Sequence, residues 1–165
     1  MKTLFQYNWM VRDEWYQWCE SVNEQELLQP RTGGVGGILK TLFHIADVEW
    51  SWMMILQGKP AGLEDFEEFN SLEKIRGLDA KYRQEVEVFV REWEPSFENR
   101  LLKLPEPDGT VETHTWGEVM RHIIAHEIHH IGQLSVWSRE MGKKPVSASL
   151  IGRSLVDKER IPSEQ

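Results

Sequence analysis

The stretch that most constrains the fold of this chain is residues 35–57, VGGILKTLFHIADVEWSWMMILQ. Its apolar side chains cover most of a helical circumference, above all in the run WSWMMIL. A helix that is apolar on most sides must be buried on several of them, either inside a bundle or between subunits. Gly58 and Pro60 follow directly, and both are typical of a helix end. The sequence therefore predicts a long central helix.

Two other segments repeat apolar residues at helical spacing. Residues 3–22 form the first, and residues 78–101 form the second, in which Pro95 is expected to kink or split the helix. Residues 61–77 are acidic and irregular, and we expect them to form a long surface crossover.

The last long helix has clear start and stop signals. Thr115 and Glu118 have the spacing of a capping box, and Gly142 ends the helix. The segment before it reads as a loop in which Asp108-Gly109 makes a hairpin-type turn between two short extended pieces. After it, a polar tail from about residue 143 is expected to be loosely held. Four long helices without a convincing sheet predict an all-α, single-domain four-helix bundle over residues 1–165.

Composition excludes several classes of function. The net charge of −8 argues against a nucleic-acid partner, because proteins that bind nucleic acids need a basic surface. The chain has no run of 18 apolar residues for a membrane span, and Arg12, Asp13 and Glu14 interrupt any signal peptide. Its single cysteine, Cys19, excludes an internal disulfide. We expect a cytoplasmic protein.

The sequence HEIHH at residues 126–130 is the strongest chemical signal, because H-E-x-x-H is the motif of zinc peptidases. A helical wheel separates its histidines. His130 lies within the apolar stripe, roughly 40° from its centre, and His126 lies at its edge, roughly 80° away. His122 and His129 lie more than about 120° away, so we interpret these two, like His114, as surface residues. The stripe consists of Trp116, Val119, Met120, Ile123, Leu134, Trp137 and Met141.

His126 and His130 are four residues apart, so both imidazoles can bind one metal ion from a rigid helix. A third ligand must come from another helix, and His44, inside the apolar segment 35–57, is the natural candidate. Asp47, one turn further on, is a candidate for orienting a ligand or contacting bound water. Glu127 lies roughly 20° from the stripe centre, which leaves open a general base, a further ligand, or a buried tie to a neighbouring helix.

A peptidase is the less favoured reading of the motif. The longer peptidase form has a glycine and a histidine where this chain has Gln133 and Val136, and only 35 residues follow His130. No strand is predicted that could hold an extended peptide. We therefore expect a metal centre of another kind, with three histidines and open positions.

The chain resembles the DinB/YfiT-like family of bacterial metal-binding four-helix proteins. The matching pieces are LFHIADVEWSW, the stretch from LPEPDGT through HEIHHIGQL, and the ending MGKKP. The resemblance implies an up-down-down-up bundle with its long crossover between the second and third helices. It also implies a zinc or nickel ion held by His44, His126 and His130, and a homodimer, which would explain the surplus of Trp and Met in residues 35–57.

For activity, the resemblance implies a transferase that uses a low-molecular-weight thiol of the bacillithiol type on an electrophilic small molecule. A metal ion would lower the pKa of the thiol and hold the thiolate. Two alternatives stay open. One is a metal-dependent hydrolase in which Glu127 or Asp47 acts as the base, and the other is a non-catalytic, metal-binding stress-response protein.

Overall fold

The computed structural model describes residues 1–62 and 64–155 of the chain. The described part is mainly helical, as the sequence predicts, with one small two-stranded sheet. Its elements are, in order, α1 (Lys2–Glu20), α2 (Glu24–Leu27), α3 (Ile38–Leu56), the 3₁₀ turn η1 (Phe66–Phe69), α4 (Leu72–Glu92), the 3₁₀ turn η2 (Pro95–Phe97), β1 (Leu101–Pro105), β2 (Val111–Thr115) and α5 (Trp116–Glu140).

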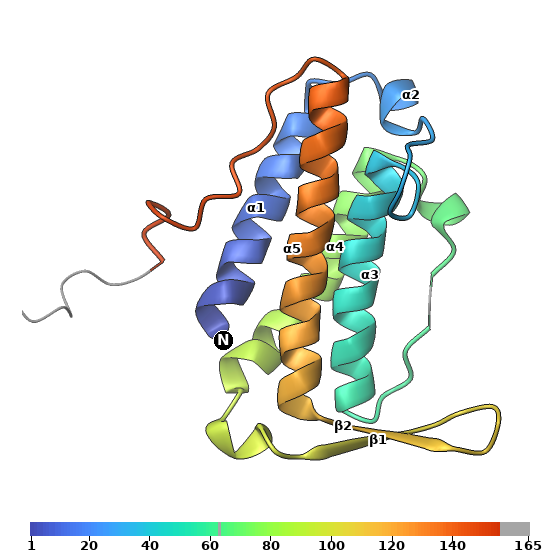
Figure 1. Ribbon diagram of the computed structural model, residues 1–165, viewed down its shortest axis with the longest axis vertical. Helices are drawn as coiled ribbons and strands as arrows, with labels where there is room; N and C mark the ends of the chain where they lie inside the picture. The colour runs from blue at the N-terminus through green and yellow to red at the C-terminus, as the bar shows by residue number, and fades with distance from the viewer. Residues whose placement is uncertain (63, 156–165) are drawn as a thin grey trace, which may run out of the picture.

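The four long helices lie side by side, with α5 in front, between α1 and α3 (Figure 1). In this view α1 and α5 run upward, whereas α3 and α4 run downward. Helix α3 packs against both α4 and α5, and α1 packs against the same two helices. The apolar segment is thus covered on several sides, because Ile38, Leu39, Leu42 and Met53 of α3 are at most 1% exposed.

Helix α4 begins earlier than predicted, and the predicted split of this segment at Pro95 is confirmed. It begins at Leu72, inside the segment that the sequence suggested was irregular, because the side chain of Ser71 accepts a hydrogen bond from the backbone N–H of Lys74 and caps the helix. It ends at Glu92, well before residue 101, since the position before a proline disfavours helix and Pro95 begins the separate turn η2.

The prediction of no sheet was wrong. Strands β1 and β2 pair antiparallel, with Leu101 opposite Thr115 and Pro105 opposite Val111. The expected turn closes this hairpin: Gly109 has a positive φ of 86°, and Asp108 accepts hydrogen bonds from Thr110. The hairpin lies across the end of the bundle where α3 ends and α5 begins (Figure 1).

The described part of the tail, residues 143–155, is held against α1, contrary to the expectation of a loose segment, and residues 156–165 of that tail lie outside the described residues. The hydroxyl of Tyr7 donates a hydrogen bond to the carbonyl of Ala148 at 2.8 Å, and Arg153 forms an ion pair with Glu14 at 2.6 Å. These contacts hold the tail as far as Arg153. No helix in the described part of the chain is long and apolar enough to cross a membrane.

Candidate metal centre

Three histidines from two helices converge at one point between α3 and α5. The Nε2 atom of His126 lies 3.0 Å from Nε2 of His44 and 3.1 Å from Nε2 of His130. One ligand atom from each ring lies within 4.8 Å of the other two. His130 is buried, as the helical wheel predicts, and His44 and His126 are half-buried. The structure therefore brings together the three residues that the sequence singled out.

This donor set fits a divalent metal ion. In a tetrahedral centre with metal–nitrogen distances of about 2.0–2.1 Å, two ligand nitrogens lie about 3.3 Å apart. The observed separations of 3.0 and 3.1 Å are close to that spacing. Without an ion, three imidazole nitrogens would face one another with too few N–H protons to form a hydrogen bond between every pair. Three neutral imidazoles leave at least one coordination position open, which is the arrangement of catalytic centres.

Gln133 fixes the orientation of the His130 ring, a contact that was not predicted from the sequence. Its Oε1 atom lies 2.7 Å from Nδ1 of His130, and its Nε2 atom lies 3.0 Å from Nε2 of His129. An amide oxygen is an acceptor, so the proton of His130 sits on Nδ1 and its Nε2 lone pair faces the other two ligands. The signal in the sequence was the spacing, since Gln133 is one turn after His130 on the same helix.

The loop before α3 holds Gln133 in place. Gly34 has a φ of 56°, and a Cβ atom at this position would lie 2.4 Å from Oε1 of Gln133. Only glycine combines that backbone conformation with such a close approach. The glycine-rich segment RTGGVGG is therefore part of the support of the centre.

The environment keeps the three imidazoles uncharged. Burial lowers the pKa of His44 to about 4 and that of His126 to about 3, and the charges of the neighbouring imidazoles lower both further. Burial also lowers the pKa of His130, although the hydrogen bond that its Nδ1–H donates to Gln133 raises it. Neutral imidazole is the form that binds metals, so at neutral pH these rings have lone pairs ready for an ion.

Glu127, which completes the peptidase motif, faces a different partner. Its two carboxylate oxygens accept hydrogen bonds from Nε and a terminal nitrogen of Arg12 at 2.9 and 2.6 Å. Both residues are 1% exposed. The structure thus supports the buried interhelical tie among the roles left open for Glu127, and the bidentate geometry occupies both of its oxygens.

Arg12 joins all four long helices. It also donates to Asp79 of α4 at 2.6 Å and to Glu49 of α3 at 2.8 Å. Burial raises the pKa of Glu49 to about 7, although the nearby positive charge of Arg12 lowers it. The sequence analysis treated Arg12 only as a charge at the N-terminus, although it lies among the buried residues Asn8, Trp15 and Cys19 of α1.

Asp47 is not among the residues whose possible ligand atoms converge. It is 3% exposed, its Oδ1 atom has no hydrogen-bond partner among the described residues, and burial raises its pKa to about 6. The charges that act on it come from Glu64 of the crossover, and its own charge acts on Tyr82 of α4. Asp47 therefore faces the side of α3 that packs against α4 and the crossover.

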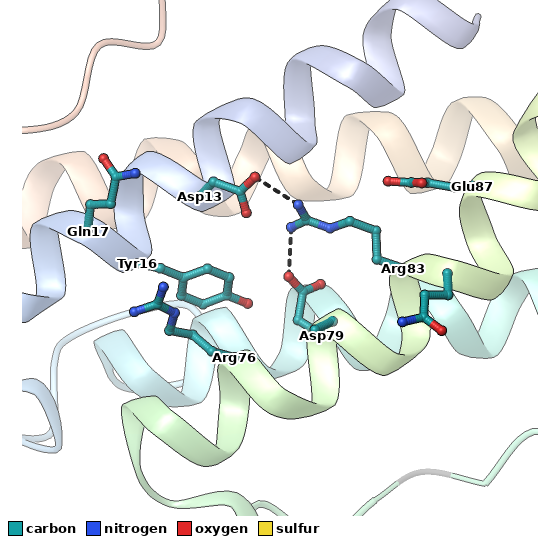
Figure 2. A pocket seen from close by; sticks show the side chains of 9 residues that line it. Asp13, Tyr16, Gln17, Arg76, Asp79, Arg83 and Glu87 are labelled. Atoms are coloured by element: carbon teal, nitrogen blue, oxygen red, sulfur yellow. Dashed lines mark hydrogen bonds and ion pairs between the residues drawn. The ribbon is translucent and has the colours of Figure 1, made fainter.

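Two of the hollows on the surface of the bundle are lined by charged or histidine side chains. One groove of about 480 Å³ lies between α1 and α4 (Figure 2), and its charged groups largely satisfy one another, since Arg83 pairs with Asp13 at 2.8 Å and with Asp79 at 2.7 Å. The other, of about 300 Å³, is lined by residues of α3, β2 and α5, among them His122 and His114. The imidazole of His122 lies beside that of His126, with 5.9 Å between ring centroids. His122 and His129 are exposed, as predicted.

Comparisons with known proteins show the family and the fold of this chain. The sequence profile described as "DinB family" matches residues 1–155. A protein of Bacillus subtilis (strain 168), "Uncharacterized protein YizA", is 46% identical over 155 residues, which are 94% of this chain and 96% of that protein. The crystal structure of a DinB-like protein, YjoA, from Bacillus subtilis is similar in fold, with a TM-score of 0.58 and 17% identity over 87% of this chain and 95% of that one.

Proposed function

This chain belongs to the DinB family, and we propose that His44, His126 and His130 hold a divalent metal ion, zinc or nickel, in an open centre. The observation that carries the proposal is the convergence of three Nε2 atoms with separations of 3.0 and 3.1 Å. The proposal includes the up-down-down-up connectivity of the bundle, which the helix directions in Figure 1 support. A homodimer and a cytoplasmic location stay predictions.

We further propose that the centre serves a transferase that uses a low-molecular-weight thiol on an electrophilic small molecule. A divalent ion with an open position lowers the pKa of a thiol that binds there. The thiol sulfur would form the new bond to the electrophile. The leaving group would depart with the electron pair of the broken bond, and the thiol proton would pass to solvent.

Two features of this chain favour an external thiol. Cys19 is the only cysteine, it is 1% exposed, and burial raises the pKa of its thiol to about 12. The protein therefore has no accessible thiol of its own. A thiol also needs no strong base at neutral pH once its pKa is lowered, and both oxygens of Glu127 are already engaged by Arg12.

A metal-dependent hydrolase is the second candidate, and Asp47 is the observation that favours it. Its pKa of about 6 suits a general base at neutral pH. Its position toward α4 and the crossover weakens this candidate, because a base must come within hydrogen-bonding reach of the attacking water.

Metal analysis tests the centre. Wild-type protein should contain one zinc or nickel ion per chain, and His44→Ala and His130→Ala should lose it. His114→Ala is the matched control, because His114 pairs with Glu112 on the hairpin and should leave the metal content unchanged. Stoichiometric metal in both triad variants would overturn the proposal.

Two assays separate the candidate activities. In cobalt-substituted protein, a low-molecular-weight thiol should change the visible spectrum, and turnover of an electrophile should require that thiol. Ester or amide turnover without any thiol would instead support the hydrolase. A folded, metal-binding protein that shows neither activity would be a non-catalytic binding protein.

A further inference from the structure

The hollow between α3, β2 and α5 is a small, mostly apolar cavity beside the triad. Its volume is about 300 Å³, at the lower end of the range for small-molecule sites. Trp52 of α3 and Val119 of α5 supply apolar walls, and the hairpin closes one side. The lining residues are Trp52, Glu112, His114, Glu118, Val119 and His122.

The cavity adjoins the triad along both helices. On α5, His122 is one turn before His126, about 6 Å along the helix axis, and their ring centroids lie 5.9 Å apart. On α3, Trp52 is two turns after His44, on a neighbouring part of the same helical face. A ligand anchored between His44 and His126 would therefore reach the cavity with a chain of a few bonds.

The side chains around the cavity suit a flat apolar group. The rings of Trp52 and His122 meet at 77°, with 5.9 Å between centroids, so they form two walls at nearly a right angle. Aromatic rings favour such edge-to-face and stacked contacts. His122 makes no hydrogen bond within the described part of the chain, which leaves its ring free to contact a ligand.

The charges around the cavity disfavour an anion. Glu112 interacts with His114 at 3.2 Å, and Glu118 accepts hydrogen bonds from the backbone and side chain of Thr115 at 2.7 and 2.9 Å. Both carboxylates have partners within the protein. A negatively charged substituent would be repelled there.

We propose that this cavity binds an uncharged aromatic ring of the substrate, with Trp52 as the residue that selects it. The proposal rests on the proposed metal centre, because the ring would be carried by a molecule whose reactive end lies at the triad. The substrate class is thus an aromatic electrophile or ester without an anionic ring substituent.

A pair of metal-anchored probes tests this subsite. Propionohydroxamate and 3-phenylpropionohydroxamate share the metal-binding group and differ by one phenyl ring. In cobalt-substituted protein, followed by its visible spectrum, the phenyl compound should bind at least about tenfold more tightly. In Trp52→Ala this advantage should disappear, while the affinity for propionohydroxamate stays the same. Trp18→Ala, which removes another half-buried tryptophan from α1, should keep the advantage.

Fluorine NMR provides a second readout that does not use the cobalt spectrum. In protein labelled with 5-fluorotryptophan, the Trp52 signal is the one lost in Trp52→Phe. It should shift with the phenyl compound and not with propionohydroxamate. A 4-carboxyphenyl analogue should lose the gain in affinity, because Glu112 and Glu118 repel it.

The outcomes separate the two proposals. Equal affinities of the two hydroxamates for wild-type protein, or an advantage that survives in Trp52→Ala, would overturn the subsite while leaving the metal centre intact. If neither hydroxamate changes the cobalt spectrum, the metal centre fails. In that case the Trp52 fluorine signal alone tests the proposed subsite. A shift with the phenyl compound supports the subsite, and an unmoved signal overturns it.

Discussion

Gln133 accepts a hydrogen bond from Nδ1 of His130 over 2.7 Å, and this contact determines which nitrogen of His130 faces His126. Outer partners of this kind orient metal-binding imidazoles and fix their tautomer. Because the loop at Gly34 lies directly against Gln133, the support of the centre extends from α5 to the segment that precedes α3.

Loss of this acceptor should weaken metal binding. We expect Gln133→Leu to retain the fold and to bind zinc about 10–100-fold less tightly, measured by competition with a chelator. Gln133→Glu keeps an acceptor at the same position and should bind far more tightly than the leucine variant. Equal affinities of Gln133→Leu and wild type would show that His130 does not depend on this contact.

Gly34→Ala should lower the metal affinity in the same way as Gln133→Leu, but to a smaller extent. The new Cβ would displace Oε1 of Gln133 and break its bond to His130. Gly36→Ala is the matched control, because Gly36 also has a positive φ, of 96°, but a Cβ there would meet nothing within 4 Å. Both variants should lose stability through backbone strain, and only Gly34→Ala should lose metal affinity. Similar metal affinities in the two variants would contradict the role of Gly34.

Removal of Arg12 should destabilise the bundle strongly. Arg12→Met leaves Glu49, Asp79 and Glu127 without their shared buried partner, which should lower the free energy of unfolding by about 3–5 kcal/mol. Arg76→Met removes an exposed pair with Glu20 and should cost at most about 1 kcal/mol. Urea unfolding measures the free energy of unfolding of both variants. Equal values would contradict the role of Arg12 as the central link between the helices.

Glu127 can be tested as a base against its role as a tie. Glu127→Gln and Glu49→Gln each remove one carboxylate from the Arg12 cluster, and only Glu127 is adjacent in sequence to a triad histidine. We expect both variants to change turnover and metal affinity to a similar, small extent, less than about tenfold. A loss of activity confined to Glu127→Gln, with metal retained, would instead identify Glu127 as a catalytic group.

The metal-free protein should lose stability on the acid side of neutrality. The pKa values of His44 and His126 in the folded protein, about 4 and about 3, lie below their ordinary value. Below about pH 6.5 the unfolded chain therefore binds protons that the folded chain does not. The contribution of these groups to the free energy of unfolding is fully present above about pH 6.5, and it is lost as the pH falls toward 4 and then 3.

Urea unfolding of metal-free protein between pH 7.5 and pH 4 measures this slope. The double variant His44→Gln, His126→Gln should lose less stability than wild type over the same range. Other titrating groups, such as Glu49, are common to both proteins and cancel in the comparison. Parallel curves for the two proteins would show that the triad is not responsible.

The helices and the inward direction of three site residues followed from sequence alone. Helix geometry is local, so the positions of His126, His130 and Glu127 on one face depended only on their spacing and on the apolar residues around them. Residues 35–57 were recognisable as a central helix for the same reason. The capping box at Thr115 fixed the start of α5, because its two hydrogen bonds join residues three apart.

Contacts between distant segments could be decided only by the tertiary structure. The distance of 3.0 Å between His44 and His126 joins two helices, and spacing within one helix contains no information about it. The same holds for Arg12, whose partners lie on three other helices, and for β1, whose residues pair only because β2 lies beside them. Local geometry thus showed which residues point inward, and only the packing of the helices decided which of them meet.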